Sequence, residues 1–264
     1  IRLILDVFGE TSLQLALLLK VNSVMLHATD VTNISLLTLV SDAHFDHVYV
    51  GVGGSKMDEI NNMLTVMKAN RIIVMTGFQA YPTEDDELNL IKIRILKNFV
   101  SQNYNNVEVG FGDHSLPESL IFEQICSLAL GLGASVIEKH LTLSKIMKME
   151  DFEAAVNPDR FALFAINLRT IYNSLTSNLT DFNVLSEGEA KYRKFVRRQV
   201  VTSRGLNAGH KIQLKDLVMK RTGLTDGFDS TNDIIKTIEY LNELEGKIIV
   251  TGIGKSAIVA MKIA

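Results

Sequence analysis

Disulfide bonding, membrane spanning and nucleic-acid binding all lack support in this sequence. Cys126 is the single cysteine among 264 residues, which excludes an intramolecular disulfide and is typical of a reducing compartment. No apolar run is long enough to span a bilayer, and no secretory leader is visible. Lysine and arginine total 27 against 30 acidic residues, so the net charge of −3 favours neither nucleic acid nor an acidic membrane as a partner. We therefore expect a cytoplasmic protein.

Hydrophobic residues make up 47% of the chain, which is ample for a buried core, and they follow a repeating pattern. Short apolar runs typical of β-strands alternate with helical patterns, and their starts are roughly 20–35 residues apart, the length of one strand–helix unit. Near-continuous apolar runs favour a parallel sheet that is covered on both faces. The pattern predicts an α/β fold, either a partial (β/α)8 barrel or an open doubly wound sheet. The predicted strands are 3–8, 23–26, 47–52, 71–75, 106–111 and 135–138.

Capping residues mark the starts of two helices. Thr83 is followed by acidic residues 84–86, which predicts an N-cap at the positive end of a helix. Asn157 precedes Pro158, a pair that predicts a cap followed by proline in the first helical position. The helix that begins at Thr83 would continue with an apolar stripe of Leu88, Ile91, Ile95 and Phe99.

The strand–helix pattern changes after about residue 180. A highly charged stretch at 187–198 leads into a compact segment that has too little apolar content for a core of its own. A further capped helix at 230–245 and a strand at 247–250 are predicted after it. Because the chain begins within a predicted strand and ends within a predicted helix, we expect a piece of a longer protein. The expected domains are 1–182, 190–224 and 228–264.

Polar residues follow four of the predicted strands at the point where each strand ends. In a barrel these ends share one mouth, where active sites are assembled. His114 and His140 follow neighbouring strands, and two imidazoles with open positions suit a divalent ion such as manganese or zinc. Their ring nitrogens should then lie within about 5 Å of each other. For each residue alone, an ordinary loop position remains the alternative. The residues concerned are His27, Gln79, Tyr81, Asp113, His114, Glu138 and His140.

Four sequence strings carry a resemblance to a known family. They are 77–83 (GFQAYPT), 89–90 (NL), 112–115 (GDHS) and 133–143 (GASVIEKHLTL). In order and spacing they resemble the sialic acid synthase family over about residues 1–180. The resemblance implies a TIM barrel that lacks its first two strands. It also implies a transferase of carbohydrate biosynthesis, which condenses phosphoenolpyruvate with an N-acetylated aldose.

The resemblance also implies roles for individual residues. His114 and His140 match the histidines that hold the catalytic divalent metal, which we expect to be manganese. In the implied mechanism the ion polarises the acceptor aldehyde, C3 of phosphoenolpyruvate attacks it, and water at C2 leads to loss of phosphate. The residues that match positions lining the acceptor sugar are Glu138, Gln79, Tyr81, Asp151 and Glu59.

Residues 197–223 resemble the antifreeze-like (SAF) domain of the same family. In the family this domain covers the barrel of the partner subunit, which implies a domain-swapped homodimer. Arg221 resembles the arginine that the SAF domain brings to the neighbouring site.

A second resemblance lies at the C-terminus. Residues 246–256 (GKIIVTGIGKS) are similar to the first strand and loop of a sugar-phosphate isomerase (SIS) domain of the arabinose-5-phosphate isomerase kind. Exposed amides at a helix N-terminus attract phosphate, although an ordinary strand-to-helix turn remains the alternative. The implied phosphate-binding residues are Gly252, Gly254, Lys255 and Ser256.

The sequence departs from the synthase pattern on the phosphate side of the site. Met25 stands where the family has a lysine, and Ala28, Gly53 and Gly112 stand where hydroxyl donors are usual. Since a phosphate dianion needs cationic or amide donors, two interpretations stay open. One is a synthase-like piece of a bifunctional protein, catalytically silent when expressed alone. The other is a non-catalytic sugar-binding or regulatory barrel attached to an isomerase domain.

Overall fold

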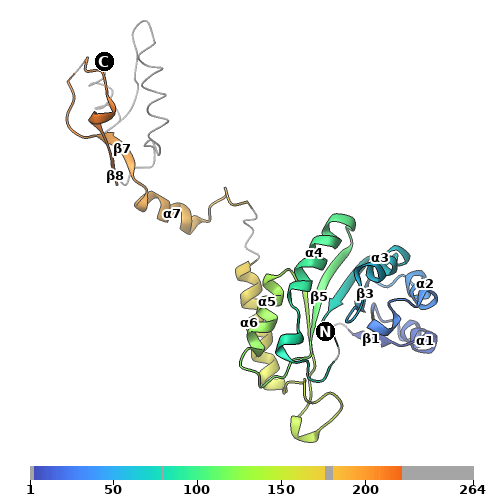
Figure 1. Ribbon diagram of the computed structural model, residues 1–264. Helices are drawn as coiled ribbons and strands as arrows, with labels where there is room; N and C mark the ends of the chain where they lie inside the picture. The colour runs from blue at the N-terminus through green and yellow to red at the C-terminus, as the bar shows by residue number, and fades with distance from the viewer. Residues whose placement is uncertain (1–2, 79, 176–180, 208, 222–264) are drawn as a thin grey trace. The chain divides into compact units, whose positions relative to one another are not determined.

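The computed structural model describes residues 3–78, 80–175, 181–207 and 209–221 (Figure 1). The chain divides into two compact units, residues 1–177 and 178–264. Within the described residues, no helix is both long enough and apolar enough to cross a membrane. The helix predicted at 230–245 and the strand predicted at 247–250 lie outside the described residues.

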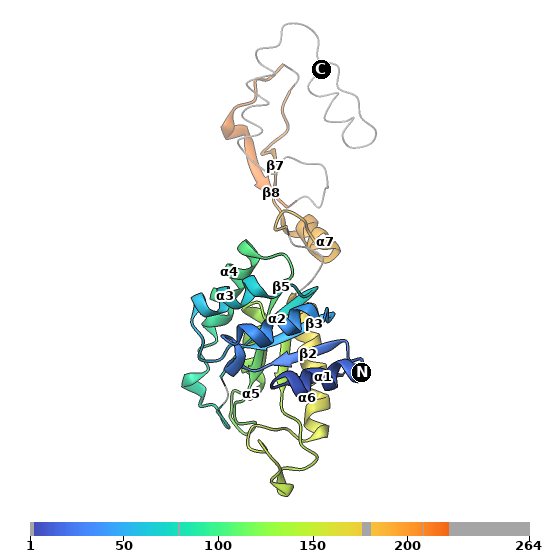
Figure 2. The same cartoon turned by 90° about the vertical axis from the view of Figure 1, so that its right-hand side faces the viewer.

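The first unit is built on a six-stranded parallel sheet. Its strands pair in the order β1-β2-β3-β4-β5-β6, so every strand lies beside its sequence neighbour, as β2 and β3 do in Figure 2. This order confirms the predicted parallel strands and excludes the doubly wound alternative, in which the strand order reverses. In the described part of the chain, the sheet ends at β1 on one side and β6 on the other. The strands are β1 (Ile4–Val7), β2 (Ser23–Leu26), β3 (His47–Gly51), β4 (Arg71–Thr76), β5 (Val107–Asp113) and β6 (Val136–Lys139).

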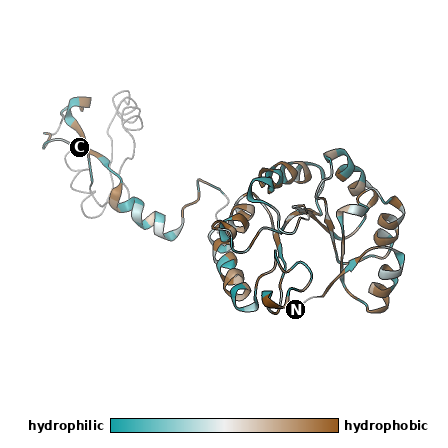
Figure 3. Ribbon diagram, turned by 60° about the horizontal axis from the view of Figure 1, so that its bottom comes forward, coloured by the Kyte–Doolittle hydropathy of each residue, from teal (hydrophilic) through white to brown (hydrophobic). Residues whose placement is uncertain are grey.

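Helices lie along the outer side of the curved sheet, as Figure 3 shows. This arrangement is that of a partial (β/α)8 barrel, in which each strand is followed by a helix of the outer ring. The helices of the first unit are α1 (Glu10–Leu18), α2 (Ile34–Asp42), α3 (Met57–Val66), α4 (Ile91–Asn103), α5 (Phe122–Gly131) and α6 (Pro158–Leu175).

The hydrophobic core fills the space between the sheet and these helices. The central strands contribute β-branched residues such as Val50 and Val74, which are fully buried and suit a pleated surface. Each covering helix contributes one apolar face to the same cluster. Buried residues on those faces are Leu37, Val40, Met63, Leu96 and Ile125.

One helix boundary follows the prediction and another does not. Helix α6 begins at Pro158, as predicted. The helix predicted from Thr83 is wrong, because α4 begins at Ile91 and residues 85–87 form a 3-10 turn. Thr83 is buried and pairs with Ser115 in a short parallel bridge. Its hydroxyl therefore serves the loop between β4 and α4 and not a helix cap.

The second unit contains helix α7 (Glu187–Val196) and an antiparallel pair, β7 (Gln199–Thr202) and β8 (Leu217–Lys220). Asp216 is buried beside the pair, where it accepts hydrogen bonds from His210 (2.8 Å) and Arg204 (3.1 Å). These partners, His210 above all, hold the pKa of Asp216 below its usual range. The identity of this segment as an SAF domain stays a prediction.

Candidate functional site

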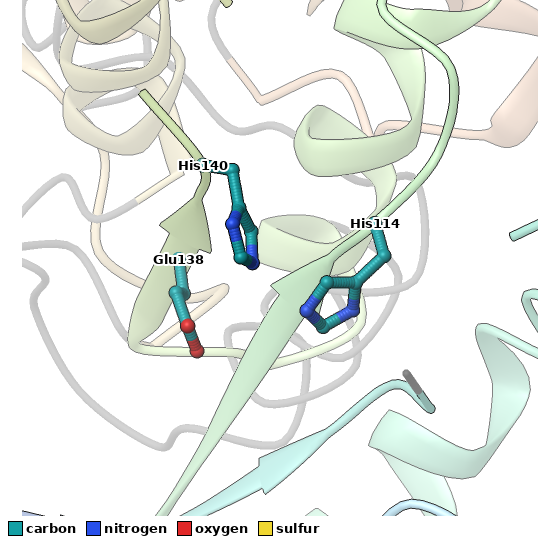
Figure 4. Close-up of side chains that lie close together, drawn as sticks. All are labelled: His114, Glu138 and His140. Carbon is teal, nitrogen blue, oxygen red and sulfur yellow. The ribbon is translucent and has the colours of Figure 1, made fainter. Parts of the chain in front are cut away.

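Three of the predicted residues come together at the carboxyl ends of β5 and β6. His114 directly follows β5, Glu138 belongs to β6, and His140 directly follows β6 (Figure 4). One ligand atom from each side chain lies within 4.8 Å of the others, and among the described residues no other group of three or more is gathered in this way. The two histidines thus lie as close as we predicted. Their proximity arises because parallel neighbours end at the same edge of the sheet.

Tyr81 lies against both imidazole rings. Its ring centre is 5.2 Å from that of His114 and 5.4 Å from that of His140, edge-on in each case. The loop that carries Tyr81 is tied to β5, because the backbone N–H of Thr83 donates to the carbonyl oxygen of His114 at 2.9 Å. The Thr83 hydroxyl also donates within its own loop, to the carbonyl oxygens of Phe78 and Ala80. A single hydrogen-bonded loop therefore positions Tyr81 relative to the histidines.

Asp151 is the fifth predicted residue at this location. Its Oδ2 lies 3.7 Å from Nδ1 of His140, and both side chains are partly exposed to solvent. A carboxylate beside an imidazole nitrogen orients the ring and favours a proton on that nitrogen. The Nε2 atom of His140 then carries no proton, and its lone pair is available to a ligand.

The electrostatics of the cluster favour neutral histidines. Burial, assisted by His140, lowers the pKa of His114 to about 4. Burial also lowers the pKa of His140, although Asp151 acts in the opposite direction. Two neutral imidazoles are the form that a metal ion requires.

The acidic groups of the cluster are shifted toward their neutral forms as well. Burial raises the pKa of Glu138, and the negative charge of Asp6 on β1 raises it further. Burial, followed by the charges of Asp151 and Glu138, raises the pKa of Tyr81 to about 12. A divalent cation placed here would offset the repulsion between these acidic groups.

The donor atoms fit a first-row divalent ion. Two ligands on opposite sides of such an ion, each at about 2.2 Å, are about 4.4 Å apart, which is close to the 4.8 Å spread of this group. Nδ1 of His114 is buried and has no hydrogen-bond partner among the described residues. An unsatisfied buried polar atom needs an explanation, and a metal ligand is one. Imidazole and carboxylate donors suit manganese, iron, cobalt and zinc alike.

A cavity of about 720 Å³ adjoins His114 and Glu138. Among the described residues that line it, Lys92 alone carries a permanently cationic side chain. Lining residues also include those that depart from the family pattern, namely Met25, Ala28, Gly53 and Gly112.

The close approach of neighbouring strand ends explains why glycine stands at position 53. A Cβ atom on Gly53 would lie 2.6 Å from the carbonyl oxygen of Gly77, and one on Gly77 would lie 2.2 Å from that of Gly112. Both contacts are with backbone, which cannot move aside as a flexible side chain can. A hydroxyl-bearing residue at position 53 would therefore require the chain at Gly77 to shift.

The remaining predicted residues are not brought into this cluster by the described contacts. The carboxylate of Glu59 accepts a hydrogen bond from the backbone N–H of Lys56 at 2.7 Å, which caps α3, and Glu59 does not line the cavity. Arg221 belongs to the second unit, where it is exposed. Residues outside the described part of the chain are Gln79, Gly252, Gly254, Lys255 and Ser256. The roles of all seven residues stay predictions.

Sequence reasoning missed two contributions to the site. Asp6 lies on β1, yet its charge raises the pKa values of Tyr81 and Glu138. Asp113 and Lys139 form an ion pair of 3.0 Å whose side chains are completely buried. The signal for the pair was present in the sequence, since charged residues are rarely fully buried without a partner and these two end adjacent apolar strands.

Comparisons with known proteins find relatives that are similar in sequence to the first unit of the chain. An uncharacterized protein of Methanocaldococcus jannaschii is 30% identical over 179 residues, covering 67% of this chain and 49% of its own length. The N,N'-diacetyllegionaminic acid synthase of Campylobacter jejuni is 25% identical over 197 residues, covering 73% and 55%. The chain thus spans about half the length of these curated relatives.

A solved structure shows the same fold. The N-acetylneuraminic acid synthetase of Leptospira borgpetersenii superposes with a TM-score of 0.62 at 24% identity, over 74% of this chain and 65% of that one. The model of the NeuB family matches residues 1–179, which is more than half of the chain and contains every residue of the described cluster. This chain therefore belongs to the NeuB family.

Proposed function

We propose that the protein to which this chain belongs is a nonulosonate synthase, which condenses phosphoenolpyruvate with an N-acetylated aldose. The observation that carries the proposal is the group formed by His114, Glu138 and His140 at the carboxyl end of a NeuB-family sheet. The Campylobacter jejuni relative is an N,N'-diacetyllegionaminic acid synthase, which supports the same class of product.

In this proposal His114, Glu138 and His140 hold a divalent metal, which we expect to be manganese. The metal, when bound, supplies a Lewis acid at the oxygen of the acceptor aldehyde. The raised pKa of Tyr81 keeps its phenol protonated at neutral pH, so the hydroxyl can donate a hydrogen bond to a substrate oxygen. Asp151 holds the ring of His140, and the cavity beside His114 and Glu138 accommodates the acceptor sugar.

A turnover assay tests the proposal in the natural full-length protein. The protein is given phosphoenolpyruvate, manganese and a panel of N-acetylated aldoses, and both phosphate release and the mass of the sugar product are followed. We expect turnover that His114→Ala and His140→Ala abolish, because each change removes a metal donor. His44→Asn is the matched control, since His44 is exposed and asparagine tolerates its positive φ of 56°. Absence of turnover with every aldose would contradict the proposal.

The lining of the cavity favours a second candidate function. Met25, Ala28 and Gly112 offer no charged or hydroxyl group to a phosphate dianion, and within the described lining Lys92 is the one permanent cation. A sugar-binding barrel without condensing activity would have such a lining. The two functions are separated by equilibrium binding, because the synthase binds phosphoenolpyruvate and the binding module takes the N-acetylated aldose alone.

We also propose the wider context that the sequence strings support. Residues 190–224 would form an SAF-like domain that brings Arg221 to the partner's site in a domain-swapped homodimer. Residues 228–264 would begin a SIS domain, which makes the protein bifunctional. Light scattering of the full-length protein checks the dimer. Loss of turnover in Arg221→Ala, restored by mixing with a variant that is inactive in its barrel, checks the exchange of Arg221 between subunits.

A further inference from the structure

A buried ion pair lies directly behind the proposed metal ligands. Asp113 and Lys139 are register partners at the last position of the β5–β6 ladder, and each immediately precedes one of the two histidines. Oδ2 of Asp113 is 3.0 Å from Nζ of Lys139, and neither side chain is exposed to solvent. The last paired position before His114 and His140 is therefore joined by side chains as well as by backbone.

The pair contacts the helix layer outside the sheet. The thiol of Cys126 on α5 donates to Asp113 Oδ2 at 3.4 Å, and the Lys139 ammonium lies 4.9 Å from the ring centre of Phe122 on the same helix. Successive side chains of a strand point to opposite faces, so the residue that follows each partner faces the inside of the barrel. The ion pair fixes the outer face while His114 and His140 occupy the inner one.

The same two side chains also hold the backbone around His114. Asp113 Oδ1 accepts the backbone N–H of Ser115 at 2.9 Å, and Lys139 Nζ donates to the carbonyl oxygen of Ser115 at 2.7 Å. The residues immediately before and immediately after His114 are therefore both held by hydrogen bonds. One of these bonds comes from Lys139 on β6, the strand that carries Glu138 and leads to His140.

Stability alone does not account for this arrangement. Removing two charges from water is costly, and well-packed apolar residues in place of a buried pair are often neutral or even stabilising. A buried pair that satisfies its hydrogen bonds instead fixes one geometry among several. Here the fixed geometry is the position of the end of β5 relative to the end of β6.

We propose that Asp113 and Lys139 are positioning residues, which hold His114 at the correct distance from Glu138 and His140 to share one divalent ion. The inference rests on the proposed function, because it assigns these two residues to that metal site. They touch neither metal nor substrate. They act by joining the two strand ends from which the three ligands project.

The test uses the double variant Asp113→Asn with Lys139→Met in the 264-residue chain. Both charges are removed together, so no buried charge is left unpaired, and asparagine keeps an acceptor for the N–H of Ser115. Manganese binding is measured by titration calorimetry. We expect a 10- to 100-fold weaker affinity, about the loss that changes behind metal ligands cause. The control is Arg71→Met with Glu108→Gln, which removes the cross-strand pair at the opposite end of the sheet and should leave the affinity unchanged.

A metal-free measurement separates positioning from a general loss of structure. The imidazole rings of His114 and His140 have centres 5.2 Å apart, close enough for a nuclear Overhauser effect between their protons in the parent chain. The double variant should lose this signal while the methyl signals of the core stay in place. A folded double variant with parental manganese affinity and an intact ring–ring signal would overturn the inference.

Two other outcomes are equally decisive. If the double variant does not fold, Lys139→Arg replaces it, because this change keeps the charges but alters the length of the pair; parental affinity in that variant overturns the inference. If the parent chain binds no manganese, the proposed metal site fails, and the inference fails with it. Parental binding that the double variant retains would reject the positioning role alone.

Discussion

The amino and carboxyl ends of the six-stranded parallel sheet place ionisable side chains in different electrostatic environments. At the amino end, Arg71 of β4 and Glu108 of β5 form an ion pair of 2.5 Å, and Ser135 donates a further hydrogen bond to the carboxylate at 2.6 Å. These side chains are partly exposed. At the carboxyl end, His114 is buried and Glu138 is half-buried, and the Nδ1 atom of His114 has no partner among the described residues.

The pKa values of the ionisable groups are shifted in opposite senses at the two ends of the sheet. Hydrogen bonding to Glu108 raises the pKa of Arg71, and the same pair lowers the pKa of Glu108, so both charged forms are stabilised. Burial lowers the pKa of His114 and raises that of Glu138, so both neutral forms are stabilised instead. Groups whose charges are left uncompensated in a cleft are typical of functional sites. The amino end therefore supports the fold, and the carboxyl end is prepared for a ligand.

The same substitution at the two ends gives the largest expected contrast. Glu138→Gln should weaken manganese binding by more than the 10- to 100-fold that changes behind a ligand cause, because it removes a donor itself. Glu108→Gln should leave the affinity unchanged. Calorimetric titration of both variants measures the contrast, and equal affinities would show that Glu138 is no ligand. The metal-free Glu138→Gln chain should unfold no more easily than its parent, since the change removes a disfavoured buried charge.

Acid should destabilise the metal-free chain through His114. Its pKa is lowered to about 4 in the folded chain, whereas an unfolded histidine titrates near 6.5. Between these values the unfolded state binds more protons, so the free energy of unfolding falls as the pH is lowered from 6.5 toward 4. The contribution is fully present above pH 6.5, and we expect a loss of roughly 3 kcal/mol across the window. Urea titrations of the parent and of His114→Asn in chelator measure it, and identical pH profiles would contradict the assignment.

The smallest effect belongs to the amino end. Glu108→Gln should lower the free energy of unfolding by at most about 1 kcal/mol, because ion pairs that solvent reaches contribute little. The stabilisation is present above the unfolded carboxyl pKa near pH 4.5 and is lost as the pH falls through the lowered folded value. Urea titrations at pH 7 and pH 3 measure it. A loss at pH 7 as large as the one expected from His114 would remove the contrast between the two ends.

Local sequence patterns predicted the strands and the site to the extent that neighbours in sequence are neighbours in space. Parallel strands in chain order end side by side, so His114 and His140 had to lie close together. The helix start at Thr83 was mispredicted because Ser115, in the loop that follows β5, pairs with it. The ion pair of Asp113 and Lys139 depends on strand register, which the spacing of apolar residues leaves open. Contacts between residues that are far apart in the sequence could therefore not be predicted from the local pattern alone.

The edge position of β6 has a consequence for motion. Within the described part of the chain β6 pairs with β5 alone, and none of its four residues is fully buried when its backbone is included, whereas β5 is mostly buried between two neighbours. Amide hydrogens of β6 should therefore exchange with solvent through local opening at a lower free energy than those of β5. Glu138 belongs to the strand that opens and His140 directly follows it, whereas His114 follows the strand that stays closed. Any ion held by all three stabilises the closed form according to its concentration and affinity, so the exchange rate of β6 reports how fully the site is occupied.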